Sequence, residues 1–185
     1  KVSDDAVAEA AKLALAPFDG PSNGTPAENP YTLHLELQDT MNSLVGIIRK
    51  AEEVSEALTK LGELRERFKN MAVEGHRQFN PGWHLAIDMR NMLLVSECVA
   101  KAALERTESR GGHTRDDYPS MDADWRKALL VCRAIDDDAV VPDISITRED
   151  QVPMREDLLA MLEIQELEKY FTPDELANHP ARRSS

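Results

Sequence analysis

The chain contains little of what several large classes of protein depend on. Its 185 residues include only two cysteines, Cys98 and Cys132, far apart and without CxxC spacing, so neither a disulfide framework nor a zinc finger is indicated. We expect reduced thiols in a cytosolic compartment. None of the eight glycines falls in a GxGxxG or GxxxxGK pattern, which argues against a self-contained dinucleotide-binding or P-loop domain. No apolar run reaches the ~18 residues of a membrane-spanning helix.

Basic residues are scarce relative to acidic ones. Lysine and arginine number 22 against 34 aspartates and glutamates, a formal net charge of −12. An acidic surface repels phosphate backbones and anionic lipids, so we expect no nucleic-acid partner and no direct membrane insertion. The remaining composition, 42% hydrophobic and 30% charged residues, is typical of a folded globular protein. The chain begins with Lys1 rather than Met, which favours a piece of a longer protein.

Three segments carry apolar residues at helical spacing, and we expect them to pack as an antiparallel three-helix bundle similar to a spectrin repeat. The first begins at Asn29-Pro30, because Asn is a good N-cap and Pro fits the first helical position. The second has the most regular seam, with alternating spacings of three and four residues. The apolar positions of the two are Leu33, Leu37, Met41, Leu44 and Ile48, then Val54, Ala57, Leu61, Leu64, Phe68 and Met71.

The third segment follows the turn 80–82, runs from Trp83 to about Glu108, and has very little polar surface. Two partner helices cover only part of such a helix, so a further apolar face needs another surface. Either the terminal segments of this chain cover that face, or a domain that is absent here does. The main polar stripe is Arg90, Glu97, Lys101, Glu105 and Glu108, and the face in question carries some of Met89, Met92, Val95 and Val99.

The segments on either side of the bundle are less regular. Ser3 caps a short first helix that we expect to end before Pro17, ahead of an irregular linker. After Gly111-Gly112 we expect a β-hairpin of Ala128–Arg133 and Val140–Ile146 around the acidic turn 136–138. A helix over Met154–Tyr170 and a last helical turn capped by Thr172 follow.

The predicted fold class is therefore mainly α. We expect three parts: 1–28, a short helix and linker; 29–110, the three-helix bundle; and 111–185, a loop, the small β-hairpin and a C-terminal helical extension.

Few residues suggest independent chemistry. The five histidines are scattered, and none pairs with another at the i, i+4 spacing of a helical metal site. Cys98 lies mid-helix and Cys132 within a predicted strand, where a thiol is most often a small buried hydrophobe. We therefore expect no catalytic, cofactor-binding or metal-binding residue in this chain.

The densest polar cluster is Glu108–Pro119, where the third helix ends beside Gly111-Gly112. Glycine there is typical of a helix C-cap, and the unpaired carbonyls of the helix end favour nearby cations, for which Arg110 and His113 are the candidates. One interpretation is a capped helix followed by a solvated, salt-bridged loop. The other is a recognition loop whose Arg–His–Arg set pairs with acidic groups on another domain.

Four short motifs resemble, in order, the C-terminal helical domain of the succinate dehydrogenase/fumarate reductase flavoprotein subunit, a superfamily that includes aspartate oxidase and adenylylsulfate reductase. The similarity covers about residues 29–131, with Trp125 following the last motif. The motifs are residues 29–38, 64–70 and 90–93, and Glu108–His113 with Arg115–Pro119.

This resemblance implies a piece of an oxidoreductase that transfers no hydride by itself. In the family the FAD-binding and capping domains, with their catalytic groups, precede this region, so the segment would carry no cofactor and FAD would belong to the full-length parent. The partners implied are those two domains and the iron–sulfur subunit, at the cytoplasmic face of the plasma membrane. The residues implied to form the interdomain interface are Glu108, Arg110, His113, Arg115 and Asp117.

The chain also departs from the family pattern. Gly112 stands where the family commonly has Ala, and Lys127 follows Trp125-Arg126 where Lys-His-Thr is common. The segment 151–185 does not match the commonest version, which suggests one branch of the family. Two alternatives remain open: a self-sufficient acidic helical-bundle interaction module, and a fragment of an aspartate oxidase.

Overall fold

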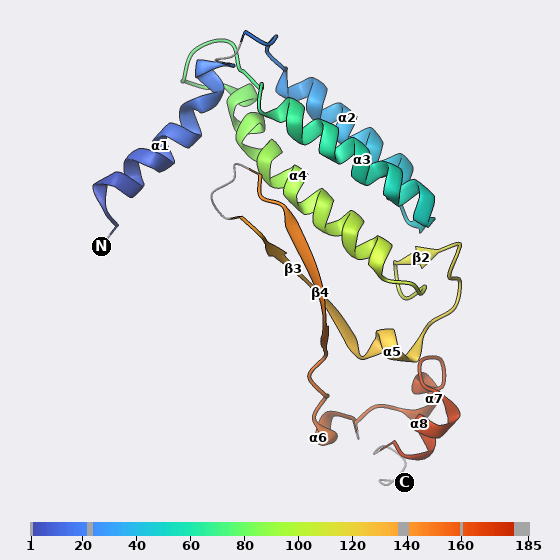
Figure 1. Ribbon diagram of the computed structural model, residues 1–185. Helices are drawn as coiled ribbons and strands as arrows, with labels where there is room; N and C mark the ends of the chain where they lie inside the picture. Colours follow the sequence, from blue (N-terminus) through green and yellow to red (C-terminus); the bar gives the residue numbers. More distant parts are fainter. Residues whose placement is uncertain (1, 22–23, 137–140, 160, 180–185) are drawn as a thin grey trace.

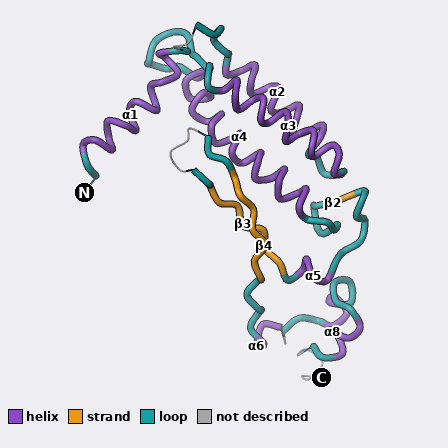
Figure 2. The backbone as a smooth tube through the Cα atoms, in the orientation of Figure 1, coloured by secondary structure: helices purple, strands orange, loops and turns teal. Residues whose placement is uncertain are grey.

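A computed structural model describes residues 2–21, 24–136, 141–159 and 161–179, and it is mainly helical, as predicted. Its centre is a bundle of three long helices: α2 (Pro30–Leu44), α3 (Ala51–Phe68) and α4 (Pro81–Glu105). Figures 1 and 2 show them side by side along one long axis. The division of the chain at residues 28/29 and 110/111 stays a prediction.

Asparagine caps start two of the three helices. The Asn29 side chain accepts from the Tyr31 N–H at 2.8 Å, with Pro30 in the first turn as predicted. Asn80 accepts from the Trp83 N–H at 3.0 Å, so α4 begins at Pro81 rather than at Trp83. The predicted turn 80–82 is therefore a helix start of the same Asn-Pro type. At its other end α4 stops at Glu105, three residues earlier than predicted.

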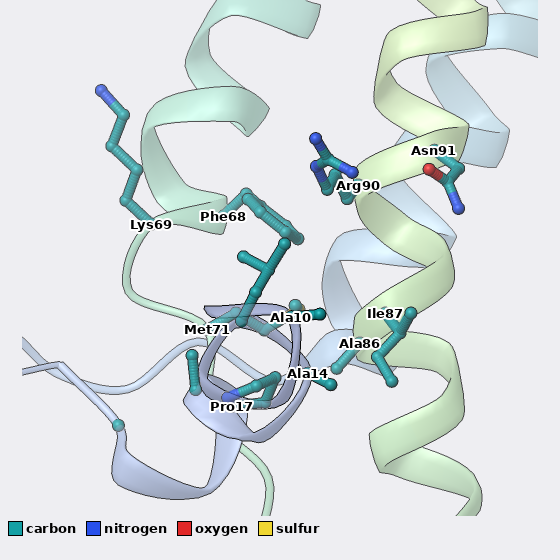
Figure 3. A pocket seen from close by; sticks show the side chains of 13 residues that line it. Ala10, Ala14, Pro17, Phe68, Lys69, Met71, Ala86, Ile87, Arg90 and Asn91 are labelled. Carbon is teal, nitrogen blue, oxygen red and sulfur yellow. The ribbon is translucent and has the colours of Figure 1, made fainter. Parts of the chain in front are cut away.

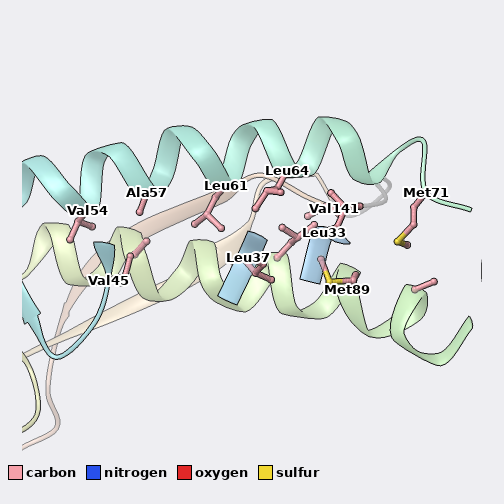
Figure 4. Packing of buried hydrophobic residues seen from close by; sticks show 13 residues of the cluster. Leu33, Leu37, Val45, Val54, Ala57, Leu61, Leu64, Met71, Met89 and Val141 are labelled. Carbon is pink, nitrogen blue, oxygen red and sulfur yellow. The ribbon is translucent and has the colours of Figure 1, made fainter. Parts of the chain in front are cut away.

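The bundle core follows the predicted seams. Leu61 and Leu64 of α3 and Leu33 of α2 are almost fully buried against Met89 and Leu93 of α4. Figure 4 shows the α3 side chains directed at α4, with α2 residues packed between them. Ile48 departs from the prediction: α2 ends at Leu44, and Ile48 lies in the short strand β1 (Ile48–Arg49), where it is 63% exposed.

The first helix, α1 (Asp4–Asp19), is longer than predicted. Ser3 caps it, its hydroxyl accepting from the Ala6 N–H at 3.2 Å. The expectation that it ends before Pro17 is wrong: Pro17 lies in the last turn, where the missing N–H removes only one hydrogen bond at the end of the helix. The Pro17 carbonyl accepts from Val73 N–H at 2.9 Å. In Figure 1, α1 projects from the end of the bundle where α4 begins.

The predicted hairpin is present, with its second strand shifted. Strands β3 (Ala128–Ala134) and β4 (Ile144–Asp150) pair antiparallel, with Cys132 opposite Ile146 and Ala134 opposite Ile144. Pro142 lies before β4 rather than inside it, because a proline cannot donate to the ladder. Val140 and the turn residues Asp137 and Asp138 lie outside the described residues.

The predicted helix over Met154–Tyr170 is wrong as one continuous element. The segment forms two short helices, α6 (Glu156–Leu159) and α7 (Ile164–Leu167). Its apolar residues are not collected on one buried face: Leu167 is buried, whereas Leu158 and Leu162 are 45% and 40% exposed. The last predicted turn is α8 (Pro173–Ala177), where Thr172 and Glu175 form a reciprocal capping box.

Helix α4 is only partly covered by this chain. The bundle covers one side, the β3–β4 hairpin packs along another, and α1 touches its beginning. Three apolar residues stay open to solvent: Ile87 at 37%, Val95 at 59% and Val99 at 42%. We call them the open stripe of α4. Within the described residues, no helix has both the length and the hydrophobicity to cross a bilayer.

Candidate functional site

The five residues predicted as an interface all lie where the chain leaves α4. Arg106 ends the helix in extended conformation, and the chain then turns back over residues 106–118, which we call the Arg115 corner. Arg110 and His113 exchange backbone hydrogen bonds of 2.8 and 3.0 Å around a tight turn. Gly111 in that turn has φ 59°, a left-handed conformation that favours glycine. The strand β2 (Thr114–Arg115) then pairs in parallel with β1.

Arg115 closes the C-terminal end of α4. Its side chain is 1% exposed. Its Nη1 donates to the carbonyls of Ala103, Leu104 and Arg106 at 2.7, 3.0 and 3.3 Å. These carbonyls have no partner within the helix, and the negative end of the helix dipole favours a cation there. The Arg115 guanidinium therefore takes the capping role that the sequence assigned to Arg110 and to a glycine C-cap, while His113 contacts one of the same carbonyls, that of Arg106. The C-cap interpretation of Gly111-Gly112 is wrong.

Asp117 connects this helix end to the start of α3. It accepts a bidentate pair of bonds from Arg115 Nε and Nη2, at 2.8 and 2.7 Å. Its Oδ2 also accepts from the Ala51 N–H at 3.1 Å, at the first residue of α3. Lys50, which precedes α3, offers no side-chain cap. The hydrogen bonds from Arg115 above all lower the pKa of Asp117 to about 2, so one ion pair joins the two oppositely charged helix ends.

Glu108 is the buried acid of the corner, with a side chain 0% exposed. It accepts from Arg106 Nη1 at 2.6 Å, from Arg110 Nε and Nη2 at 3.0 and 2.9 Å, and from the Asp122 N–H at 2.9 Å. Burial raises its pKa, but the bonds from Arg110, the Asp122 backbone and Arg106 outweigh burial and lower the pKa to about 2. Glu108 is therefore a fixed carboxylate and not a proton donor.

His113 is held neutral in one tautomer. Arg49 Nη1 lies 2.8 Å from Nδ1, and Nε2 lies 3.1 Å from the Arg106 carbonyl. Since Arg49 can only donate and a carbonyl can only accept, the proton sits on Nε2. Burial lowers the pKa of His113, and repulsion from Arg49, Arg115 and Arg106 lowers it further, although the bond to the Arg106 carbonyl acts in the other direction.

Sequence reasoning placed these five residues in one cluster, where the structure also has them, but missed three neighbouring partners. Arg49 lies 64 positions before His113. Arg106 donates to the Trp125 and Ala128 carbonyls at 3.1 and 3.0 Å and stacks 4.9 Å from the Trp125 ring centroid. Trp125 Nε1 donates to Thr107 at 2.9 Å. Only Trp125 gave a signal, as the tryptophan that follows the last motif.

The corner is suited to holding a shape rather than to catalysis. Its carboxylates Glu108 and Asp117 are bonded to arginines, and its buried Arg115 is bonded to carbonyls and a carboxylate. Over the described part of the chain, no three His, Cys, Asp or Glu side chains gather as a metal site would require. The interface role of Glu108, Arg110, His113, Arg115 and Asp117 stays a prediction.

A separate cavity of about 400 Å³ lies between α1, α4 and the end of α3. Figure 3 shows Ala10, Ala14 and Pro17 of α1 facing Ala86 and Ile87 of α4 across it. Phe68 and Met71 close one side, and Lys69 and Arg90 also line it. The lining is mostly small and apolar and brings no nucleophile near a base, so it indicates loose packing of α1 on the bundle.

Comparison with known proteins decides the family. A family model described as the fumarate reductase flavoprotein C-term matches residues 34–169. The chain belongs to this family. The resemblance drawn from the four motifs is thereby confirmed, and the match extends beyond residue 131, through the hairpin and into the short C-terminal helices.

Relatives carry this region as a minor part of a larger protein. The chain is 38% identical over 105 residues to the fumarate reductase flavoprotein subunit of Helicobacter pylori, covering 56% of this chain and 15% of the relative. It is 34% identical over 127 residues to the succinate dehydrogenase flavoprotein subunit of Coxiella burnetii, covering 68% and 21%. The chain thus spans well under a quarter of these relatives.

Solved structures share the fold. A chain of the Mycobacterium smegmatis Sdh1 complex in the apo form is 65% identical, with a TM-score of 0.85, covering 97% of this chain and 30% of that one. The Escherichia coli quinol fumarate reductase FrdA is 26% identical with a TM-score of 0.67, covering 81% and 26%. The family is one of flavoproteins, and these relatives belong to oxidoreductase complexes.

Proposed function

We propose that this chain is a C-terminal docking domain of a succinate dehydrogenase or fumarate reductase flavoprotein subunit, and that it supports the rest of the subunit without transferring hydride itself. On this proposal FAD belongs to the flavin-binding domain of the longer protein. The capping domain and an iron–sulfur subunit are the further partners, and these partners hold the assembly at the cytoplasmic face of the membrane.

The open stripe of α4 is the observation that carries this proposal. Val95 and Val99 are exposed on a helix that is otherwise packed on several sides, and Ile87, which also lines the cavity beside α1, extends this row. Exposed apolar residues scattered singly need no explanation, but a row on one long helix is typical of a covered surface. A chain that spans 30% of its structural neighbour leaves enough of the protein to cover it.

The Arg115 corner supports the same proposal as a rigid contact. Arg115 and Glu108 are buried and fix the loop from within, whereas Arg110 and Asp117 keep 24% and 30% of their side chains exposed. Because each charged group already has a partner, docking against this loop would require little reorganisation. We infer that Glu108, Arg110, His113, Arg115 and Asp117 form an interdomain contact. The buried Glu108 and Arg115 act through the loop shape that they impose.

The proposal can be tested in the whole protein encoded by the reading frame that contains this chain. Val95→Asp combined with Val99→Asp places two carboxylates in the proposed contact. We expect limited trypsin digestion to release the C-terminal domain at least ~tenfold faster, because burying an unpaired charge is strongly unfavourable. Dye-linked succinate oxidation, measured on the same samples, should fall with it.

Leu35→Asp is the matched control, since Leu35 is 64% exposed on α2 and lies outside the open stripe. It should digest at the rate of the unsubstituted protein. If the double variant behaves as this control does, the chain does not dock through α4, and an independent acidic interaction module becomes the better interpretation.

A further inference from the structure

The two cysteines of this chain meet across two different elements. Cys98 lies in the second half of α4 and Cys132 in the middle of β3, and both are partly buried. Cys132 is near enough to Cys98 to raise the pKa of the Cys98 thiol, and both cysteines are free. A chain with only two cysteines, 34 positions apart in sequence, thus brings both to one place.

Strand register accounts for this meeting. Alternate residues of a strand share a face, and so do residues directly opposite one another in an antiparallel pair. Cys132 pairs with Ile146, and two positions along Ala134 pairs with Ile144. Ile144 is 6% exposed, and its carbonyl accepts from Lys101 Nζ at 2.8 Å. The Cys132 face of the hairpin is therefore the face packed on α4, where Cys98 lies one turn before Lys101.

We propose that Cys98 and Cys132 form a modification site, a dithiol that hydrogen peroxide oxidises to a disulfide joining α4 to β3. The thiolate of Cys132 attacks a peroxide oxygen, the O–O bond breaks, and water leaves, which gives a sulfenic acid on Cys132. The sulfur of Cys98 then attacks that sulfur, loses its proton, and the hydroxyl departs as a second water. The two thiols lose two electrons and two protons in total, and the peroxide is reduced to water.

The surroundings assign the order of the two steps. Burial raises the pKa of Cys98 to about 11, and the neighbouring Cys132 and Glu97 raise it while Lys101 lowers it. Cys98 therefore stays a thiol near neutral pH and is a poor first nucleophile. The first attack falls to Cys132, and Cys98 resolves the sulfenic acid through its minor thiolate fraction, from the helix surface that the Cys132 face of the hairpin packs on.

The disulfide would lock a particular part of the fold. The loop that it closes, from Cys98 to Cys132, contains the end of α4, the whole Arg115 corner and the first half of the hairpin. Closing a loop removes conformations from the open states of that segment. Oxidation would therefore hold the hairpin on the bundle without changing any residue of the corner.

Tryptic mapping of the whole protein tests the site directly, because Cys98 and Cys132 fall in the separate peptides Asn91–Lys101 and Ala128–Arg133. The folded protein is treated with hydrogen peroxide, alkylated in denaturant without reductant, and digested. We expect the two peptides joined with a mass lower by two hydrogens, and dithiothreitol should release both. Two separately alkylated or sulfinic peptides without the joined species would overturn the proposal.

Moving the thiol by one position gives a matched control. Val131→Cys combined with Cys132→Ala places the sulfur on the opposite face of the strand, so the yield of joined peptide should fall at least ~tenfold. An undiminished yield would show that the joining does not depend on the described register and would overturn the proposal.

The order of attack has its own readout. In Cys98→Ser, dimedone should trap a sulfenic acid on Cys132, whereas Cys132→Ser should leave Cys98 largely unlabelled at neutral pH. The reverse labelling pattern would contradict the assignment of Cys132 as the first nucleophile.

Discussion

Arg115 is the single residue on which the corner depends most. Its side chain is 1% exposed and bonds three carbonyls and one carboxylate. Arg115→Met keeps much of the volume but removes the charged donor from the three carbonyls and from Asp117. Breaking one partner of a buried ion pair costs about 3–5 kcal/mol, and we expect a loss of that size in the free energy of unfolding. Urea denaturation followed by circular dichroism measures it.

Arg133→Met is the control for this change, because Arg133 pairs with Glu149 on the exposed hairpin with 55% of its side chain open to solvent. An exposed pair contributes only about 0–1 kcal/mol. If the two variants lose the same free energy, Arg115 is an ordinary surface arginine and the capping role assigned to it is wrong.

The titrating groups of the corner make its stability depend on pH in two windows. Folding lowers the pKa of His113 from 6.5, so the stability it contributes is present above that pH and declines as pH falls below it. Glu108 and Asp117 have folded pKa values of about 2 against 4.5 and 3.8, so their contribution is lost as pH falls from about 4 towards 2.

The variant His113→Gln separates the pH dependence that comes from His113 from that of Glu108 and Asp117. Glutamine keeps an acceptor and a donor but does not titrate, so the decline that begins below pH 6.5 should flatten while the decline below pH 4 persists. Unfolding free energies measured in urea between pH 3 and 8 give both slopes. An unchanged slope above pH 5 would mean that His113 is not held neutral by the fold.

Local sequence gave the identity of the corner residues but not their roles. Arg110 looked like the helix-capping cation because it stands close to the helix end in sequence, and Arg115 takes that place because the strand pairing of β2 with β1 directs it back over α4. Arg49 could not be found, since only tertiary pairing brings it to His113.

Arg65 joins three elements at once. From α3 it donates through Nη1 to Glu97 on α4 at 3.2 Å and to Asp143 at 2.8 Å, and through Nη2 to the Val141 carbonyl at 2.8 Å. Glu97 also pairs with Lys101 at 2.7 Å, and Lys101 reaches the hairpin through the Ile144 carbonyl. These connected contacts anchor the start of β4 to the bundle.

Arg65→Met should loosen the hairpin more than the bundle. It leaves Glu97, 7% exposed at its side chain, with Lys101 as the partner that remains. We expect amide exchange in β4 to speed up by about tenfold or more while exchange in the α3 core changes less. Lys60→Met, on the same helix and paired with Glu56 at the surface, is the control and should change neither. Equal acceleration of amide exchange in α3 and β4 would contradict the prediction that Arg65 anchors β4 to the bundle.

Helix starts with a local capping signal could be predicted, whereas the helical segment over 154–170 could not. Asn29-Pro30, Ser3 and the Thr172 capping box each start a helix where expected. The segment 154–170 has helical spacing, but leucine spacing alone cannot supply the neighbour that a helix must bury against. Contrary to the prediction, Pro17 does not end the helix. The free-energy cost of a proline depends on its position in the helix, and in the last turn that cost is small.

At the level of the whole chain, the sequence predicted that α4 has more apolar surface than the bundle can cover. The structure divides that surface: Met89 is buried in the core, Met92 is partly buried, and Val95 and Val99 remain exposed. The terminal segments of this chain cover only part of α4: the hairpin packs along one side of the helix, and α1 contacts its beginning. The sequence alone could not show which residues of this face are covered, because that depends on where the hairpin turns back.

Thiol labelling at Val95 tests the central claim most directly. Val95→Cys, made with Cys98 and Cys132 replaced by alanine, is reacted with a maleimide in this chain alone and in the whole protein, with Leu35→Cys in parallel. We predict labelling of position 95 at least ~tenfold slower in the whole protein than in the isolated chain, and equal rates for position 35. Equal rates at position 95 in both would contradict docking through α4.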